Sequence, residues 1–290
     1  MLLPLAGRRL YYDMVGSESG PVVCITHSLA SDSGMWAEQM APLLQGGFRV
    51  LRIDMRGHGG SDPVAGDYTM KTLASDVAAV LDVLSLPRVH YIGLSIGGMI
   101  GQAFAIEYGA KLISALWSDT LPSSPAGAAA LWDERMSTVR RANSLEPLAD
   151  GTVERWFTDA FKPRKPGRWK QIRDTVAATT PAGYLGCSAA IMNFDFIAQL
   201  PSLRLPTLVV CGADDPGTPA SENRRLAGLV PGGRYEEIAN ARHFPNVEHP
   251  EAFNRIMTGW LEAQRHLRRR SSLVSLRRGG LQGASAAHSA

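Results

Sequence analysis

One serine of this chain stands inside a cluster of glycines. Ser95 lies in the segment HYIGLSIGGMIG, with glycines at 93, 97 and 98. Glycine loses more backbone freedom on folding than any other residue, so such a cluster indicates a sharp bend or a close approach of the backbone. The chemistry that such a bend could serve is attack by the serine hydroxyl, which is a weak nucleophile unless a neighbouring base activates it.

The segment GLSIG, residues 93–97, fits the pattern G-x-S-x-G of a nucleophile elbow. An elbow needs a strand before the serine and a helix after it, and the flanking segments RVHYI and GGMIGQAFAIEYG have those two characters. A tight turn between them would strain Ser95 and bring its hydroxyl beside a helix N-terminus, where free N–H groups favour negative charge. These features favour a reactive serine over an incidental one in a glycine-rich turn.

A histidine further along the chain is the expected base, because the pattern places an acid and then a histidine after the serine. Five of the seven histidines precede Ser95 or lie near the C-terminus: His27, His58, His90, His266 and His288. His243 lies in NARHFPNVEHPEAF, a predicted loop between a strand and the last helix, and is the preferred base. His249 precedes Pro250 and is expected to cap that helix.

Three aspartates could orient the imidazole and stabilise its protonated form. Asp214 and Asp215 follow a strand-like run in VVCGADDPGTP, and Asp119 follows the run LISALWS. We rank Asp215 first, then Asp214, then Asp119, and the residues alone leave the choice open. The unused member of the adjacent pair would serve the turn, since Asp before Pro and Gly is a common turn former.

Two backbone N–H groups are needed to stabilise the developing oxyanion. Ile96 directly follows the nucleophile and supplies the first. Leu29, in the loop HSLASDSGMW after the strand-like run VVCIT, is the expected second donor. Its neighbour Ser28 is a candidate pocket residue, and His27 is expected to be structural.

These residues are far apart in the chain, so a scaffold must bring them to one edge. Short β-branched runs alternate with helical patterns, which predicts an α/β fold with a mostly parallel central sheet flanked by helices. The segment RLYYDMV, residues 9–15, is expected to add an antiparallel edge strand. The other predicted strands are 21–27, 49–54, 88–93, 112–118, 206–212 and 234–238. The predicted helices are about 35–44, 71–84, 97–108, 220–229 and 251–265.

The alternation stops between about 121 and 198, where helical patterns continue without strands. We interpret residues 121–198 as an inserted helical cap over the carboxyl ends of the strands, where open α/β sheets bind ligands. Residues 1–120 and 199–264 would form the core, and residues 265–290 a disordered basic tail.

Three tryptophans of the predicted cap could contribute to a substrate pocket. Trp132 and Trp156 are candidate pocket residues, while aromatic residues at helical spacing, Trp169 among them, more often belong to a core. Met99, just past the elbow, is expected to pack rather than to line the pocket.

Composition excludes several classes of protein. The chain is 45% hydrophobic and 20% charged, as globular proteins are. Six arginines and no acid lie in residues 265–290, so the remainder carries a charge of about −3 and suggests no nucleic-acid partner. No apolar run reaches the ~20 residues that span a membrane. Three widely spaced cysteines match no metal site and predict buried free thiols in a cytoplasmic protein.

Five segments in order resemble the α/β-hydrolase superfamily over about residues 9–264, and within it the 3-oxoadipate enol-lactonase group and related esterases. The segments are HSLASDSGMW, RIDMRGHGGSD, GLSIGGMIGQ, GADDPGTP and RHFPNVEHPEAFN. The resemblance implies a catalytic triad of Ser95, Asp215 and His243, because the aspartate three after Gly212 matches the acid of that group. The chain departs from the group at His27-Ser28, where enol-lactonases often have Asn-Ser.

The loop DMRGHGGS is widespread in the superfamily and carries no information on substrate, so Arg56 and His58 are expected to be structural. The resemblance implies a cofactor-free and metal-free hydrolase that opens a small ester or lactone through an acyl-enzyme. Similar proteins also open N-acyl-homoserine lactones or cleave simple esters. Two alternatives remain: a perhydrolase that uses the same triad, and a small-ligand receptor with slow turnover.

Overall fold

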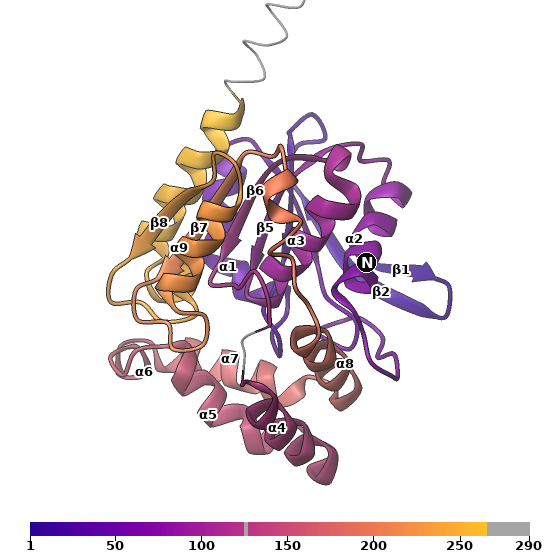
Figure 1. The fold of residues 1–290 in the computed structure, drawn as a ribbon, viewed down its shortest axis with the longest axis vertical. Coiled ribbons are helices and arrows are strands. Elements are labelled where there is room, and N and C mark those ends of the chain that lie inside the picture. Colours follow the sequence, from indigo (N-terminus) through magenta and orange to yellow (C-terminus); the bar gives the residue numbers. More distant parts are fainter. Residues whose placement is uncertain (125–126, 266–290) are drawn as a thin grey trace, which may run out of the picture.

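The computed structural model describes residues 1–124 and 127–265 and contains one eight-stranded sheet (Figure 1). Its strand order is β1-β2-β4-β3-β5-β6-β7-β8, with the neighbours from β4 to β8 parallel. The strands are β1 (Leu2–Leu5), β2 (Arg8–Val15), β3 (Val22–Thr26), β4 (Arg49–Ile53), β5 (Val89–Leu94), β6 (Leu112–Ser118), β7 (Thr207–Gly212) and β8 (Arg234–Ile238). The predicted mostly parallel sheet is confirmed.

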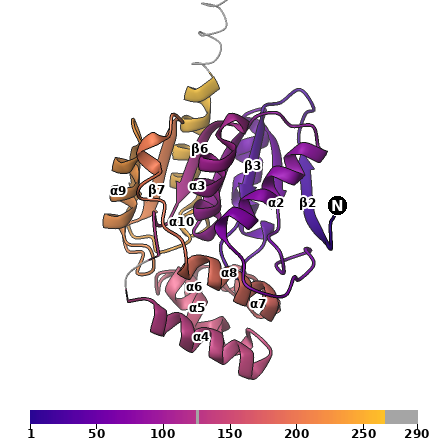
Figure 2. The same cartoon turned by 45° about the vertical axis from the view of Figure 1, so that its right-hand side comes forward.

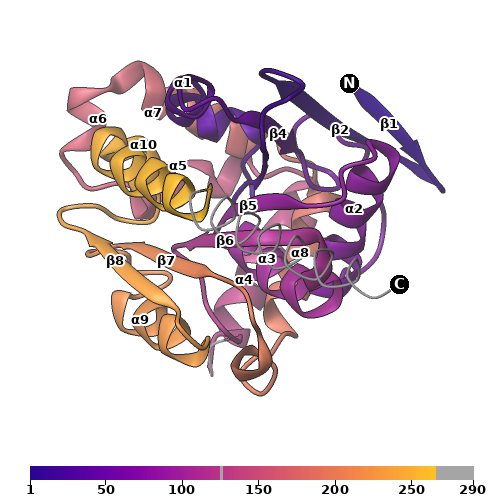
Figure 3. The ribbon, with the colours of Figure 1, turned by 90° about the horizontal axis from the view of Figure 1, so that it is seen from above.

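The central strands β3, β5, β6 and β7 are buried at every residue, as apolar strands covered on both faces must be. Viewed from above, α1 (Ala37–Gln45) and the helix of residues 250–265 cover one face of the sheet (Figure 3). The other face carries α2 (Met70–Val83), α3 (Ile96–Tyr108) and α9 (Ala220–Leu229). A hydrogen bond of 2.9 Å from Gln39 to Asn254 ties the first pair of helices together.

The N-terminal hairpin corrects one prediction. Strand β2 pairs antiparallel with β4, as expected, but it is not the edge, because β1 pairs with its other side. The segment LLPL of β1 is too short for a clear period and contains Pro4, which a strand tolerates at a sheet edge. Sequence pattern therefore missed an eighth strand.

Five further helices lie below the carboxyl ends of the strands in Figures 1 and 2. They are α4 (Ala129–Ala142), α5 (Glu146–Trp156), α6 (Phe161–Arg164), α7 (Pro166–Ala178) and α8 (Pro181–Met192). Their apolar side chains, such as Val153 and Ile172, join the hydrophobic core of the sheet domain. The inserted helical cap is confirmed, while the boundaries at 121 and 198 stay predictions.

Short helices complete the connections: η1 (Ser33–Trp36), η2 (Gly109–Lys111), η3 (Leu200–Ser202) and α10 (Pro245–Glu248). Cys24, Cys187 and Cys211 are buried and free, as predicted. Across residues 1–124 and 127–265, no helix has both the length and the apolar character needed to cross a membrane. The predicted basic tail, apart from Arg265, lies outside the described residues.

Candidate active site

Ser95 forms a strained turn between β5 and α3. Its backbone has φ 58° and ψ −120°, which few residues other than glycine adopt. Hydrogen bonds hold the turn, since Ser95 N–H donates to Ser118 O at 2.9 Å and Thr120 Oγ1 donates to Ser95 O at 2.8 Å. The serine is therefore the N-cap of α3, with its hydroxyl at a helix N-terminus, where negative charge is favoured.

Two glycines flanking Ser95 are required by close backbone contacts. A Cβ atom on Gly93 would lie 2.2 Å from Gly97 O, and a Cβ on Gly97 would lie 2.7 Å from Thr26 O and 2.8 Å from His27 O. These neighbours are backbone atoms of β3, the loop after it and α3, which cannot move aside as a flexible side chain can. Glycine is therefore needed at these positions because the tight elbow leaves no room for a Cβ atom.

Asp215 and His243 form a buried pair at the ends of neighbouring strands. His243 Nδ1 lies 2.7 Å from Asp215 Oδ2, which fixes the ring with its Nδ1–H donating to the carboxylate. The carboxylate also accepts from Thr218 Oγ1 and from Gly217 N–H, the latter at 2.8 Å. Burial raises the pKa of Asp215, but the charge and hydrogen bond of His243 outweigh it, so the pKa lies below its ordinary value.

The two other candidate acids are placed differently. Asp214 is exposed, and its N–H donates to Ala241 O at 2.9 Å, which joins the loop after β7 to the loop after β8. Asp119 is fully buried within 4.8 Å of the ligand atoms of Asp215 and His243, yet its oxygens accept from Gly212 N–H at 2.8 Å and Ser118 Oγ at 2.6 Å. Burial and the charge of Asp215 raise the pKa of Asp119 well above its ordinary value, which favours its neutral form.

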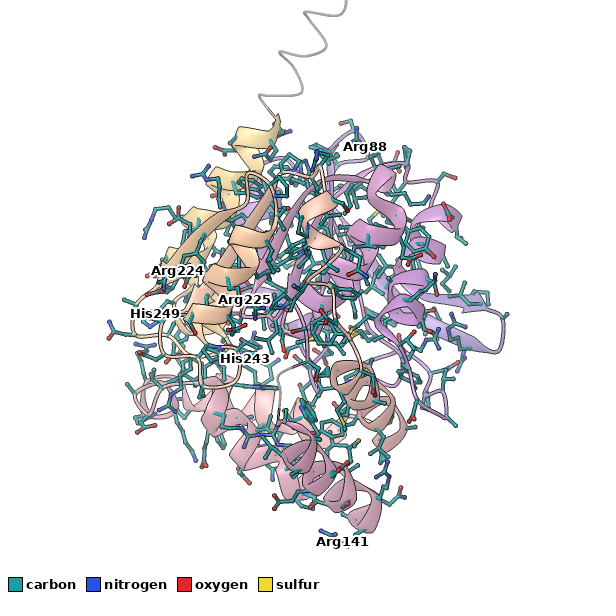
Figure 4. All side chains as sticks on the ribbon, viewed as in Figure 1. Arg88, Arg141, Arg224, Arg225, His243 and His249 are labelled. Carbon is teal, nitrogen blue, oxygen red and sulfur yellow. The ribbon has the colours of Figure 1, made fainter. Side chains whose placement is uncertain are left out.

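Packing from the cap fixes the position of His243. Trp156 stacks on Phe244 with ring centroids 4.2 Å apart and lies 6.4 Å from the His243 ring. Figure 4 shows His243 where the core meets the cap and His249 further out. His249 Nε2 is bonded to Asn240 O at 2.8 Å, so it belongs to the loop and not to the site. Within the described chain, no hydrogen bond yet joins Ser95 to His243, and such bonds often tighten only with substrate.

The predicted N–H donors lie beside Ser95. Ile96 is the first residue of α3, so its N–H has no acceptor inside the helix. Leu29 lines the same cavity as Ser95, and its N–H has no acceptor among residues 1–124 and 127–265. Ser28 also lines the cavity, and its buried Oγ has no hydrogen-bond partner in that part of the chain.

The histidines before Ser95 hold loops in place. His27 Nδ1 bonds Ser28 O at 2.8 Å, and its Nε2 accepts from Met55 N–H at 2.9 Å, which joins two loops. Burial and the neighbouring His27 lower the pKa of His58 to about 3, so this ring is neutral. Arg56 forms a buried ion pair with Asp76. These contacts support structural roles for His27, His58 and Arg56.

One cavity of about 250 Å³ lies between core and cap and contains these groups. Its core wall includes Ser28, Leu29, Ser95, Met99, Asp215 and His243. Its cap wall includes Leu131, Trp132, Arg135, Arg155, Trp156 and Tyr184. The candidates Trp132 and Trp156 are thus at the cavity and Trp169 is not. Met99 packs in the hydrophobic core, as predicted, but it also lines the cavity, because the tight elbow brings the first turn of α3 there.

Sequence reasoning missed four polar residues of the cap wall: Arg135, Thr152, Arg155 and Tyr184. The helical spacing carried a signal for Arg135 alone, because it lies three residues after Trp132 and so shares a helix face with it. Only the packing of three separate helices, α4, α5 and α8, shows that these positions face one cavity.

Comparison with known proteins agrees with this geometry. The sequence pattern of the alpha/beta hydrolase fold family matches residues 21–250. The chain is similar to 3-oxoadipate enol-lactonase 2 of Acinetobacter baylyi, with 32% identity over 84% of this chain and 90% of that protein. It is also similar to the carbamate hydrolase RutD, as that protein is named, of Variovorax paradoxus, with 28% identity over 87% and 96%.

Among solved structures, the enol-lactonase from Burkholderia xenovorans LB400 superimposes with a TM-score of 0.86 and 32% identity, over 90% of this chain and all of that one. The family pattern covers most of the sheet and the whole cap, including the elbow and both residues of the buried pair. The chain belongs to the alpha/beta hydrolase fold family.

Proposed function

We propose that this chain hydrolyses carboxylic esters or lactones with Ser95, His243 and Asp215 as its catalytic triad. The observation that carries the proposal is the buried Asp215–His243 pair, in one cavity with a strained serine at a helix N-terminus. The similarity to enol-lactonases supports a lactone or ester as the substrate.

In the proposed reaction, Ser95 Oγ attacks the substrate carbonyl while His243 Nε2 takes the hydroxyl proton. Asp215 holds the ring by its Nδ1–H and stabilises the imidazolium that forms. The Leu29 and Ile96 N–H groups stabilise the tetrahedral oxyanion, and one such donor is typically worth about a hundred- to thousandfold in rate.

Collapse of this intermediate breaks the bond to the leaving oxygen, which receives the proton from His243. In a lactone the leaving alcohol stays attached to the acyl group, so nothing departs until the second step. His243 then deprotonates a water molecule, which attacks the acyl-enzyme and releases the carboxylic acid and Ser95. No step requires a metal or cofactor.

The experiment that tests this proposal combines turnover with covalent labelling. We expect the protein to hydrolyse para-nitrophenyl butyrate or 3-oxoadipate enol-lactone, and a fluorophosphonate to attach to Ser95. Ser95→Ala should abolish labelling and lower kcat by several orders of magnitude, up to about 10⁶-fold. Turnover that survives this substitution would overturn the assignment.

The panel should also separate the competing activities. It would include N-acyl-homoserine lactones and a simple carbamate, since a similar protein is named for carbamate hydrolysis. Peroxide-dependent bromination in acetate would identify a perhydrolase. Ligand-induced stabilisation with negligible turnover of every substrate would identify a receptor.

A further inference from the structure

One buried hydroxyl of the core wall is left without a hydrogen bond in the described chain. Ser28 is 1% exposed and lines the cavity that contains Ser95, yet its Oγ has no partner there. Most buried polar side chains are hydrogen-bonded, because a donor or acceptor that leaves water without a new partner costs stability. Of the buried side-chain polar atoms without a partner in residues 1–124 and 127–265, Ser28 Oγ is the one that belongs to a residue of this cavity.

The backbone of Ser28, in contrast, is fully bonded. Its N–H donates to Met35 Sδ at 3.3 Å, and its carbonyl oxygen accepts from Ser31 N–H at 3.2 Å. The same oxygen lies 2.8 Å from His27 Nδ1. Because Nε2 of that ring accepts from Met55 N–H, Nδ1 carries the proton and donates to Ser28 O. The backbone is therefore held on both sides, and rotation about the Cα–Cβ bond is the movement that the Ser28 side chain retains.

The chain that leads to Ser28 is packed against the elbow. Thr26 Oγ1 donates to Gly97 O at 3.2 Å, and a Cβ atom on Gly97 would lie 2.8 Å from His27 O. The residue after Ser28 is Leu29, the second proposed N–H donor to the oxyanion. The Ser28 side chain is attached to the Cα atom next to the Leu29 peptide unit, so an oxygen that accepts from Leu29 N–H comes close to Ser28 Oγ.

The other polar side chains of the core wall are already engaged. His243 Nδ1–H and Thr218 Oγ1 both donate to the carboxylate of Asp215. Ser95 is the proposed nucleophile, and its oxygen bonds to the carbonyl carbon rather than donating to the carbonyl oxygen. On this wall of the described chain, the Ser28 hydroxyl is thus the side-chain donor that remains for a developing oxyanion.

We propose that Ser28 is a further catalytic residue, whose hydroxyl donates a third hydrogen bond to the oxyanion beside the Leu29 and Ile96 N–H groups. This inference rests on the proposed function of the Ser95 site. When Ser95 Oγ bonds to the carbonyl carbon, the π electrons move to the carbonyl oxygen, which then carries a full negative charge. A hydrogen bond to an ion is about twice as strong as one between neutral groups, so the hydroxyl stabilises the intermediate more than the bound substrate. The Ser28 O–H bond stays intact throughout.

A buried hydroxyl without a partner also affects the stability of the free protein. Its hydrogen bonds to water have been lost on folding and none has replaced them, which lowers the stability of the fold. The oxyanion supplies the missing acceptor only during the reaction. Removal of the hydroxyl should therefore slow the reaction without destabilising the protein, whereas removal of a structural serine would reduce stability as well.

The test measures turnover and stability in the same variant. For para-nitrophenyl butyrate, Ser28→Ala should lower kcat and kcat/KM together by about ten- to a hundredfold, the range of a hydrogen bond to a charged group. Its melting temperature should equal or exceed that of the wild type. Ser28→Cys keeps a side chain of similar shape with a weaker donor, so its kcat should resemble that of Ser28→Ala. A melting temperature that falls together with kcat would mean that Ser28 supports the loop, and would overturn the proposal.

Ser31→Ala is the matched control. Ser31 lies in the same loop and is also buried, at 3% exposed, but it lines a separate cavity of about 330 Å³. This variant removes the same atom from the same loop outside the Ser95 cavity, so it should keep the wild-type kcat. Equal losses of kcat in Ser28→Ala and Ser31→Ala would mean that the loop tolerates neither change, and would contradict a specific donor at Ser28.

Inhibition by a transition-state analogue separates this inference from the proposed function. A trifluoromethyl ketone with a butyl chain should form a hemiketal with Ser95 whose ionised oxygen imitates the oxyanion. Its inhibition constant should rise in Ser28→Ala by the factor by which kcat/KM falls. A wild-type inhibition constant and a wild-type kcat in Ser28→Ala would overturn the third donor and leave the hydrolase standing. A wild-type protein that neither hydrolyses any ester nor binds the ketone would overturn the proposed function, and this inference with it.

Discussion

The cavity has two walls that are built in different ways. On the core wall, Ser95, Asp215 and His243 are 8%, 4% and 7% exposed, and each is held by hydrogen bonds or backbone contacts. On the cap wall, Leu131 is 51% exposed and Arg155 is partly exposed as well. The core wall comes from turns at strand ends, and the cap wall from the faces of α4, α5 and α8.

This difference separates two tasks. Groups that form and break bonds need positions fixed to within a fraction of an ångström, which strained turns and buried hydrogen bonds provide. Groups that select a substrate need charge and shape, which helix faces supply and which can change without disturbing the elbow. Substitutions on the core wall should therefore affect kcat most, and those on the cap wall should affect the choice of substrate.

The largest effect on the core wall, after loss of Ser95 itself, is expected from Asp215→Asn. The amide can no longer hold His243 with its Nδ1–H directed at a carboxylate, so the ring loses the tautomer that accepts the serine proton. A comparable change in a serine protease lowers kcat about 10⁴-fold. Steady-state hydrolysis of a neutral ester measures the loss.

Asp214→Asn is the matched control for that variant. The residue is adjacent in sequence but exposed, and its bond to Ala241 O comes from the backbone N–H, which asparagine keeps. We expect less than about a twofold change, as for a surface substitution. Equal losses in the two variants would contradict the assignment of Asp215.

Much of the core wall could be predicted from the sequence. The elbow is a local pattern, because Gly93, Ser95 and Gly97 are required by one turn. The residues alone leave three candidates for the acid of the triad, with Asp215 ranked first. Only the resemblance to the enol-lactonase group gives a further reason to choose Asp215. The structure places Asp215 against His243 because β7 and β8 pair in parallel and end together.

The next largest effect is expected when a glycine of the core is replaced by alanine, and a glycine of the cap serves as its counterpart. Gly97→Ala would place a Cβ against Thr26 O and His27 O, so we expect about 1–3 kcal/mol of destabilisation, as for an overpacked core. Gly167→Ala lies in α7, where a new Cβ meets nothing within 4 Å. It should stabilise the fold by about 0.4–1 kcal/mol through the unfolded state.

Urea unfolding of the two glycine variants and of the wild type measures both changes. Activity should fall with Gly97→Ala, because the elbow must shift to admit the methyl group, and should stay at the wild-type level with Gly167→Ala. Unfolding free energies that moved in the same direction for both variants would contradict the contrast between the tight elbow of the core and an open helix position of the cap.

The cap wall could not be predicted in the same way. Trp132 and Trp156 are candidate pocket residues because they are aromatic. The charged residues beside them resemble an ordinary solvated helix face in the sequence, and only the packing of α4 against α5 shows that they line the cavity. Long-range packing also explains why the sequence ranks Asp119 only as a third candidate acid and does not place it beside the Asp215–His243 pair. Its position depends on the alignment of β6 with β7, which no local pattern records.

The finest test of the core wall concerns the two buried acids at neighbouring strand ends. Asp215 has a lowered pKa because His243 outweighs its burial, whereas Asp119 has a raised pKa because burial and Asp215 act together. Asp119→Asn mimics the neutral acid, and its carbonyl oxygen can still accept from Gly212 N–H. Asparagine also tolerates the positive φ of 45° at this position.

The sign of the effect follows from proton uptake. Below about pH 3.8 the Asp119 carboxyl is protonated in both the folded and the unfolded chain, so its contribution to stability is complete. As the pH rises, the unfolded chain ionises while the folded chain keeps its proton, and stability is lost until the raised folded pKa is passed. Asp119→Asn removes this loss, so its free energy of unfolding should gain on the wild type as the pH rises from 5 to 8. Parallel stability curves would instead mean that Asp119 is ionised in the folded protein, and that the two acids beside His243 share one charge state.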